Sequence, residues 1–306
     1  MNSTKKLVGV VVPTYNGGRY LKSCLESIVS GQTLKPDRVI IVDGGSTDNT
    51  LAIAAECGVP SVITSPNRCS QRNLGKSIVS TDYVLFIDQD MILEPEVIKE
   101  CYEMSRNDDD SSAIVIRERM GGNGYWSAVR GFQREFFDVW WLEAARWFSS
   151  EVFDSVHGYD TEMVGFEDWD LDERVRKQGV LISRSRATVI HDEGGPSYRG
   201  LLRKKAYAAE AMSTFSDRHP ARAKLCFGAL ARARLFLRQP KQFLYHPVLG
   251  LGCLALSLGE YAVGTLKLSS GKYHVPEQRF SMKDSKDHAS YSAQVKEYGK
   301  PTTIGE

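Results

Sequence analysis

Two aspartates, Asp88 and Asp90, follow directly on the buried-looking apolar run at residues 83–87. Because side chains alternate along an extended chain, both carboxylates can face the same way at a strand's carboxyl end, where open α/β sheets bind ligands. Carboxylate oxygens are the ligands that Mg²⁺ and Mn²⁺ prefer. The pattern points to a divalent metal and a phosphorylated ligand, although a polar turn after a strand has the same sequence.

A second acidic group consists of Glu167, Asp168 and Asp170 around Trp169, just before a helical pattern at residues 171–177. The helix dipole favours acidic residues at a helix start, and this accounts for Asp170 without any chemistry. It accounts less well for Trp169. An aromatic ring among carboxylates offers a stacking surface for a sugar, or a wall that raises the pKa of a neighbouring carboxyl group.

The glycine-rich turn at residues 43–48 is the third feature that chemistry could use. Glycines let the backbone approach a ligand, and Asp43 can accept hydrogen bonds from a nucleobase or ribose; a tight turn with a helix cap is the alternative. There is no P-loop and no Gly-x-Gly-x-x-Gly after the first strand. A P-loop NTPase and a Rossmann dehydrogenase are therefore disfavoured. His191, which ends the apolar run at residues 188–190, is either a structural residue or a ligand.

Short β-branched runs alternate with helical patterns in the first 87 residues. The predicted strands are 7–12, 39–42, 61–63 and 83–87, and the predicted helices are 20–29, 50–56 and 69–79. This alternation predicts right-handed crossovers and a mostly parallel sheet. We expect Asn16, Asp43, Arg72 and Asp88 to lie at one edge of that sheet, on loops or helix starts.

Composition describes an ordinary globular protein. The chain has 306 residues, 42% of them hydrophobic, and a formal net charge of +1. Six scattered cysteines without a Cys-x-x-Cys pair predict free thiols in a reducing compartment. The apolar run after Lys5 and Lys6 is short and lacks a cleavage site, so it predicts a first strand and no signal peptide.

The final third is basic and then apolar. Residues 198–241 contain eleven Lys or Arg and two acidic residues, and the helical pattern at residues 221–237 suits an interfacial helix on anionic lipid. Nucleic acid is the competing partner, but no nucleic-acid-binding motif accompanies the charge. The apolar run at residues 249–258 is about half the length that spans a bilayer. It predicts peripheral or re-entrant membrane attachment at the cytoplasmic face, with a buried helix or dimer interface as the alternative.

In this order, the motifs resemble those of family 2 glycosyltransferases with the GT-A fold, over about residues 8–215. They are Val12-Pro13-Thr14-Tyr15-Asn16, Val42-Asp43-Gly44-Gly45-Ser46-Thr47-Asp48, Arg72-Asn73-Leu74-Gly75, Asp88-Gln89-Asp90 and Glu167-Asp168-Trp169-Asp170. The resemblance implies a nucleotide-sugar donor, with a UDP-sugar favoured and a GDP-sugar possible, a divalent metal (Mn²⁺ or Mg²⁺), and inversion at the anomeric carbon.

The resemblance also implies roles for individual residues. It places Pro13, Thr14, Tyr15 and Asp43 around the nucleotide base and ribose, and Arg72 near the donor.

The acidic motifs acquire roles in the same way. Asp88 is expected by the ribose and metal, with Asp90 as the direct metal ligand and His191 as a further candidate ligand. Gln89, an unusual middle residue, is expected to point away from the metal. Asp168 is the implied catalytic base, while Glu167 and Trp169 are assigned to the donor sugar or acceptor.

The predicted protein is thus an α/β GT-A enzyme, Rossmann-like with a mostly parallel central sheet. We expect a catalytic domain at residues 1–215, a membrane-associating helical extension at 216–280 and a polar tail at 281–306. The predicted reaction is metal-dependent, inverting transfer of a sugar to a hydroxyl group on a glycan or lipid-linked cell-surface precursor. Two alternatives stay open: a polyprenyl-phosphate sugar synthase, whose acceptor needs no base, and a nucleotide-sugar-binding scaffold without turnover.

Overall fold

An eight-stranded mixed sheet organises the described part of the chain, in the order β3-β2-β1-β4-β7-β6-β8-β5. The computed structural model describes residues 5–106, 111–163 and 165–270. The strands are β1 (Val8–Thr14), β2 (Arg38–Asp43), β3 (Ser61–Ile63), β4 (Tyr83–Phe86), β5 (Met91–Leu93), β6 (Ala113–Gly121), β7 (Trp147–Ser149) and β8 (Ile182–Asp192).

The first four strands are parallel, as their alternation with helices predicts. β1 lies between β2 and β4, and the register pairs Thr14 with Asp43 at the carboxyl ends of β1 and β2. Beyond β4 the sheet becomes mixed, because β7 runs antiparallel to both β4 and β6, and β5 runs antiparallel to β8. The β5 pairing places Met91 opposite His191, so the segment after Asp90 and the end of β8 are neighbours.

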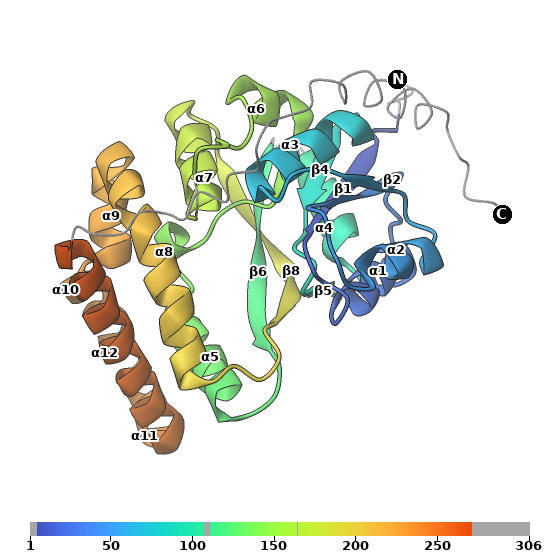
Figure 1. Ribbon diagram of the computed structural model, residues 1–306. Coiled ribbons are helices and arrows are strands. Elements are labelled where there is room, and N and C mark those ends of the chain that lie inside the picture. The colour runs from blue at the N-terminus through green and yellow to red at the C-terminus, as the bar shows by residue number, and fades with distance from the viewer. Residues whose placement is uncertain (1–4, 107–110, 164, 271–306) are drawn as a thin grey trace. The chain divides into compact units, whose positions relative to one another are not determined.

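Helices cover both faces of the sheet (Figure 1). Those that connect or follow the strands are α1 (Leu21–Val29), α2 (Thr50–Glu56), α3 (Arg68–Val79), α4 (Val97–Arg106), α5 (Tyr125–Phe136), α6 (Ser150–Ser155) and α7 (Glu167–Lys177), with a short 3₁₀ turn at Trp140–Leu142. The C-terminal helices are α8 (Tyr198–Arg218), α9 (Pro220–Phe227), α10 (Ala229–Leu237), α11 (Pro240–Tyr245) and α12 (Pro247–Ser270).

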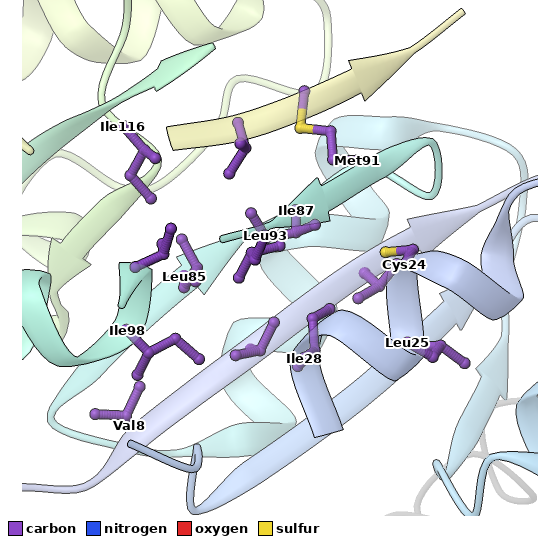
Figure 2. Packing of buried hydrophobic residues seen from close by; sticks show 14 of the residues in the cluster. Val8, Cys24, Leu25, Ile28, Leu85, Ile87, Met91, Leu93, Ile98 and Ile116 are labelled. Carbon is purple, nitrogen blue, oxygen red and sulfur yellow. The ribbon is translucent and has the colours of Figure 1, made fainter. Parts of the chain in front are cut away.

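Strand alternation divides the core into two layers. Val10 and Leu85 face one layer, in a cluster with Leu25 and Ile28 of α1. Figure 2 shows Leu85, Leu25 and Ile28 in this layer. Val11 and Phe86 face the other layer, under α3, α6 and α7, and form a separate cluster of buried side chains. All six cysteines are free, as predicted, and five of them are buried.

The helical pattern at residues 221–237 is interrupted in the structure. Pro220 starts α9, and Gly228, with φ −66° and ψ 124°, separates α9 from α10. Glycine loses more conformational entropy in a helix than other residues, which makes this a favourable position for the break. The predicted polar tail at residues 281–306, and the part of the predicted extension after residue 270, lie outside the described residues.

Candidate active site

The carboxyl ends of β1 and β2 are joined through Asp43. Its carboxylate is fully buried and accepts hydrogen bonds from Thr14 Oγ1 at 2.8 Å and from the backbone N–H groups of Gly45 and Ser46 at 3.0 and 2.7 Å. Gly45 has φ +82°, a conformation that favours glycine, which explains its place in the turn. Asp43 thus holds the turn together. Pro13 of β1 is buried and lies opposite Val42, the residue before Asp43.

Tyr15, in contrast, is 52% exposed and is held through its backbone. The Gln89 side chain accepts from Tyr15 N at 2.9 Å and donates to Tyr15 O at 3.2 Å. Gln89 therefore fixes the loop after β1 against the segment that carries Asp88 and Asp90. The sequence does not predict this contact, because nothing about Gln89 except its position between two aspartates distinguishes it.

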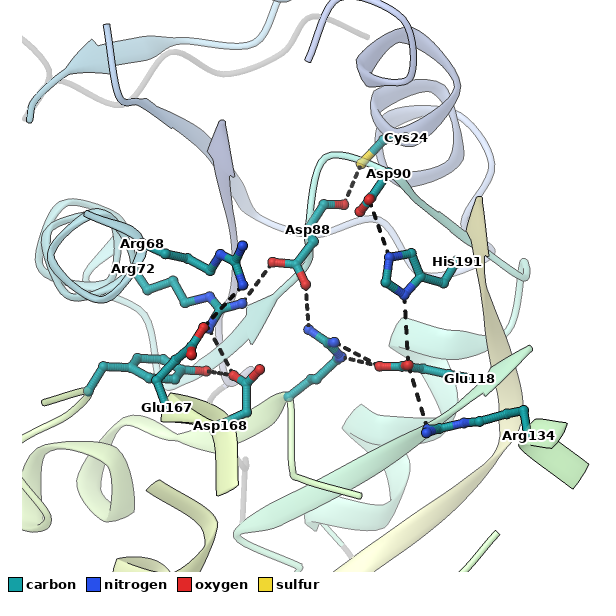
Figure 3. Close-up of polar contacts among 12 residues, drawn as sticks. Cys24, Arg68, Arg72, Asp88, Asp90, Glu118, Arg134, Glu167, Asp168 and His191 are labelled. Carbon is teal, nitrogen blue, oxygen red and sulfur yellow. Dashed lines mark hydrogen bonds and ion pairs between the residues drawn. The ribbon is translucent and has the colours of Figure 1, made fainter. Parts of the chain in front are cut away.

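Arg72 of α3 is the centre of the site (Figure 3). Its guanidinium is fully buried and donates to Asp88 Oδ1 at 2.7 Å and to Asp168 Oδ1 at 2.8 Å. Glu167 Oε1 lies 3.5 Å from the same group. A buried cation is tolerated only when it is paired and hydrogen-bonded, and these carboxylates supply that pairing. The structure thus brings together three residues that sequence motifs predict separately.

Tyr159 completes the surroundings of Arg72, and Asn73 positions it. The Asn73 amide donates to Tyr159 O at 2.8 Å and accepts from Tyr159 N at 2.9 Å. This places the Tyr159 ring 4.9 Å from the Arg72 guanidinium and its hydroxyl group 3.2 Å from Asp168 Oδ1. The sequence does not predict this contact, because Asn73 and Tyr159 become neighbours only in the folded chain.

A second arginine, Arg146, lies on the other side of Asp88. It donates to Asp88 Oδ2 at 3.2 Å and to Glu118 Oε1 at 2.7 and 3.0 Å. Neither Arg146 nor Glu118 was predicted from the sequence. The sequence does contain one indication. Each of the two is a charged residue next to an apolar strand segment, and burying a charge there costs free energy unless the charge is paired.

Asp90 and His191 lie together, as expected for a pair at neighbouring strand ends. His191 Nε2 is 3.2 Å from Asp90 Oδ2, and His191 Nδ1 is 3.9 Å from Glu118 Oε2. Burial lowers the pKa of His191, but the contacts with Asp90 and Glu118 outweigh it and raise the pKa to about 9. The charged contacts therefore run without a break from Asp90 through His191, Glu118 and Arg146 to Asp88.

Electrostatics keep this network ionised. Burial alone raises the pKa of the Asp88 carboxyl group, but Arg72 and then Arg146 hold that pKa well below its usual range. In Glu118, burial acts in the same direction and is again overcome, chiefly by Arg146, so its pKa also lies well below the usual range. Both side chains are therefore carboxylates at neutral pH.

Asp90 and His191 are the candidate metal donors. In the described part of the chain, no group of three or more His, Cys, Asp or Glu side chains is placed to hold a metal ion. Asp88 faces the arginines instead (Figure 3). One carboxylate oxygen and one imidazole nitrogen suit Mn²⁺ or Mg²⁺ only if the substrate diphosphate and water supply the remaining ligands. Because the pKa of His191 is about 9 without a metal, the imidazole must also lose its proton before it can bind one. The donor set fits a metal that arrives with its substrate.

The two residues assigned to the sugar or acceptor lie in different surroundings. Glu167 is 5% exposed and contacts Arg68 Nη1 at 3.2 Å, so it neutralises the arginines of α3. Trp169 stacks on Phe166 with 5.0 Å between ring centroids and belongs to an aromatic cluster with Phe215 and Phe227.

A cavity of about 300 Å³ adjoins the network at Glu118. Arg117, Arg134 and Arg184 line it, and each is paired with a carboxylate of Glu118, Asp138 or Glu143. Its charges are therefore largely balanced within the protein.

The fold matches that of a known sugar-transferring protein. The mannosyltransferase PcManGT from Pyrobaculum calidifontis, solved with GDP-Man and Mn²⁺, aligns with a TM-score of 0.56 and 14% identity over 88% of this chain and 89% of that one. At this identity the likeness shows the fold, which is the predicted GT-A fold.

Sequence comparison names the family. Residues 9–159 match the model of Glycosyl transferase family 2, and the chain belongs to this family. Glycosyltransferase GlyG of Streptococcus pneumoniae serotype 4 is 32% identical over 116 residues, covering 36% of this chain and 38% of that protein. The PGL/p-HBAD biosynthesis glycosyltransferase of Mycobacterium bovis is 23% identical over 219 residues, covering 68% of this chain and 85% of that protein. The chain spans only 26% to 38% of the length of several curated relatives.

Proposed function

We propose that the protein transfers a sugar from a nucleoside-diphospho-sugar to a hydroxyl group, with inversion and with a divalent metal. The observation that carries the proposal is the Arg72 bridge, which joins Asp88 at 2.7 Å to Asp168 at 2.8 Å. Asp88 follows the donor-side strand β4, and Asp168 lies in the first turn of α7. One guanidinium therefore brings the donor carboxylate and the assigned base to the same point.

Asp168 has the geometry of a general base. The contacts from Arg72 and Tyr159 both reach Oδ1, and no donor among the described residues contacts Oδ2. The Asp168 side chain is 27% exposed. Oδ2 can therefore accept the proton of an acceptor hydroxyl group while Oδ1 keeps the carboxylate in position. Positioning of this kind lowers the barrier by reducing the freedom that the reacting groups must lose.

The departing nucleoside diphosphate needs positive charge near it. Asp90 and His191 would hold Mn²⁺ or Mg²⁺, which supplies Lewis-acid neutralisation of the leaving oxygens when bound. Arg68, at the start of α3, adds a guanidinium that is 61% exposed and available to a donor phosphate. The GDP-Man and Mn²⁺ bound to PcManGT support a donor of this class. A UDP-sugar is the donor we favour, with a GDP-sugar as the second candidate.

The first test measures thermal stabilisation by UDP, GDP, dTDP and CDP, each with and without Mn²⁺. A ligand that binds only the folded state raises its stability by mass action. We expect a metal-dependent shift with one nucleotide that is lost in Asp90→Ala. No shift with any nucleotide would contradict the donor site and favour a scaffold.

The second test separates the acceptor classes. Asp168→Asn keeps the shape of the side chain and removes the base, so turnover onto a hydroxyl acceptor should fall by about 10²–10⁴ while nucleotide binding is retained. If turnover with a polyprenyl monophosphate survives this substitution, the acceptor is already ionised and the protein is a polyprenyl-phosphate sugar synthase. As acceptor we propose a glycan or lipid-linked precursor of the cell surface.

A further inference from the structure

The C-terminal helix α12 is built into the domain along one side only. It runs beside α8 in Figure 1, and its buried inner side chains include Cys253, Leu256 and Glu260. Its outer face carries a stripe of large apolar side chains that the domain does not cover. These are Val248, Leu251, Leu254, Leu258 and Tyr261, which are 66%, 70%, 44%, 70% and 53% exposed.

The spacing of the stripe confirms that it is one face. Residues three and four apart lie above one another on an α-helix, so positions 248, 251, 254, 258 and 261 form a continuous line. The preceding helices add Leu237, Leu244 and Tyr245, each more than 70% exposed. Large apolar patches on a soluble surface mark an interaction site more often than single exposed leucines do.

The charges near this face are almost all positive. Between residues 219 and 266 the only acidic residue is Glu260, and it is buried, 3.8 Å from Arg232 and 4.0 Å from Arg130. Arg234 and Lys241 are exposed, and neither forms an ion pair with any described residue. This surface therefore combines exposed apolar side chains with exposed cations that no described carboxylate neutralises.

We propose that the outer face of α12, together with the exposed cations of α10 and α11, docks this domain onto an anionic lipid bilayer. Leucines and tyrosines enter the boundary between headgroups and acyl chains, and the cations meet anionic headgroups. This surface goes beyond the proposed reaction and does not require it. It would bring the active site to acceptors that are held in a membrane.

Charge argues against a second copy of the chain as the occupant. A two-fold contact places the same patch on both partners, so the cations of α10 and α11 would approach their equivalents, and α9 to α12 carry no exposed carboxylate to separate them. Like charges brought together in this way destabilise the contact. An anionic bilayer offers the complementary charge.

The docked position of α12 argues that the helix lies on the membrane and does not cross it. By length and composition, Pro247–Leu266 is able to span a bilayer. However, Tyr125 Oη donates to Val248 O at 2.9 Å, Tyr198 Oη donates to Ala255 O at 3.2 Å, and Gln133 contacts Ser257 at 3.2 Å. Crossing would break these contacts and place the Glu260 carboxylate in hydrocarbon, which is costly.

The inner face also depends on close approach. A Cβ added at Gly252 would lie 2.3 Å from Tyr125 Oη, and one at Gly259 would lie 2.3 Å from Tyr198 Oη. These glycines let α12 settle against two tyrosines of α5 and α8. The helix is therefore part of the domain, with its apolar side left outward.

Vesicle flotation of the full chain tests the proposal. We expect binding to phosphatidylcholine vesicles that contain phosphatidylglycerol, and much weaker binding to phosphatidylcholine alone. Leu251→Ser/Leu258→Ser should reduce binding at least about tenfold, because each leucine loses its apolar transfer into the bilayer. Arg234→Gln/Lys241→Gln should reduce binding about 25-fold at low salt, roughly fivefold for each charge.

Matched controls use equally exposed side chains elsewhere. Leu181→Ser/Ile63→Ser and Lys22→Gln/Lys35→Gln should float as the unmodified chain does, and thermal melting should show that every variant is folded. Equal binding to both vesicle types, or full binding by the α12 variants, would overturn the proposal. A third result would also overturn it: the unmodified chain binds no vesicles and sediments as a dimer, and Leu251→Ser/Leu258→Ser sediments as a monomer. Asp168→Asn should float normally, so loss of transfer activity and loss of docking can be distinguished.

Discussion

Arg72 Nη1 lies 2.8 Å from Asp168 Oδ1, so the assigned base is held by a guanidinium that is itself fully buried. The other nitrogen of the same fork, Nη2, holds Asp88 at 2.7 Å. A planar fork can satisfy two carboxylates at fixed separation, which a lysine ammonium cannot do in the same way. Arg72 therefore sets the distance between Asp88 and Asp168, the residues that we assign to the donor and to the base.

Arg72→Lys keeps the charge and tests the fork. We expect stability to fall by about 1.5–3 kcal/mol, because one charge-assisted hydrogen bond is lost, and kcat/KM to fall about 100-fold, because Asp168 is no longer positioned. Urea unfolding and steady-state kinetics measure the two effects. Arg176→Lys is the control. Arg176 forms an i,i+4 pair with Asp172 at 2.8 Å, but Arg222 also holds Asp172 at 2.6 Å, so loss of the Arg176 contact should cost only about 0.5 kcal/mol. Unchanged turnover in Arg72→Lys would show that Asp168 does not depend on the guanidinium for its position.

Arg146 and Glu118 should behave as a coupled pair. Each single substitution, Arg146→Met or Glu118→Gln, leaves a buried charge without its nearest partner, at 2.7 Å, and should destabilise the protein by about 3 kcal/mol. The double variant should lose clearly less than the two single effects together. Urea denaturation of all four proteins completes the cycle. Additive losses would mean that the 2.7 Å contact contributes no coupling.

Local patterns predicted the elements that carry the site. The helix predicted at 69–79 is found as α3 at Arg68–Val79, and the strand predicted at 83–87 is found as β4 at Tyr83–Phe86, because periodicity is a local property. The resemblance to a family supplied the roles of Arg72 and Asp168, which local spacing alone does not assign.

Long-range pairing is what the sequence left open. Arg146 is 58 residues from Asp88 along the chain, and Tyr159 is 86 residues from Asn73. Nothing in the sequence around Glu118 indicates that it faces the arginine that precedes β7, because this contact follows from the place of β7 between β4 and β6. Only the cost of burying a lone charge hints that partners exist.

Lys205 of α8 makes folding stability depend on pH. Burial, and then the nearby Arg232, lower its pKa from 10.5 to about 8. Between these two values the unfolded chain binds the proton and the folded protein does not, so the Lys205 contribution to stability rises with pH from about 8 to 10.5. Below that window both states are protonated, and the full penalty for the buried charge applies.

Lys205→Met should therefore raise Tm at pH 7 by about 2–4 °C, and this advantage should shrink as the pH approaches 10.5. Thermal melting of both proteins across this range gives the difference directly, so that other titrating groups cancel. Lys22→Met on α1, where the side chain is exposed, should leave Tm unchanged at every pH. A constant difference between Lys205→Met and the unmodified protein would show that Lys205 does not titrate in this window.

Gly75, in the same motif as Arg72, should be needed because α3 lies so close to the sheet. A Cβ at this position would lie 2.3 Å from Val11 Cγ1, nearer than real Cβ contacts. Gly75→Ala should cost about 1–3 kcal/mol through overpacking, and it should lower turnover because Arg72 is one helical turn away on α3. Gly131→Ala in α5 is the opposite case. A Cβ added at Gly131 would have no neighbour within 4 Å among the described residues. Replacing a flexible glycine inside a helix should therefore raise the free energy of unfolding by about 0.5–1 kcal/mol. Urea unfolding that shifts both variants in the same direction would contradict the close approach of α3 to β1.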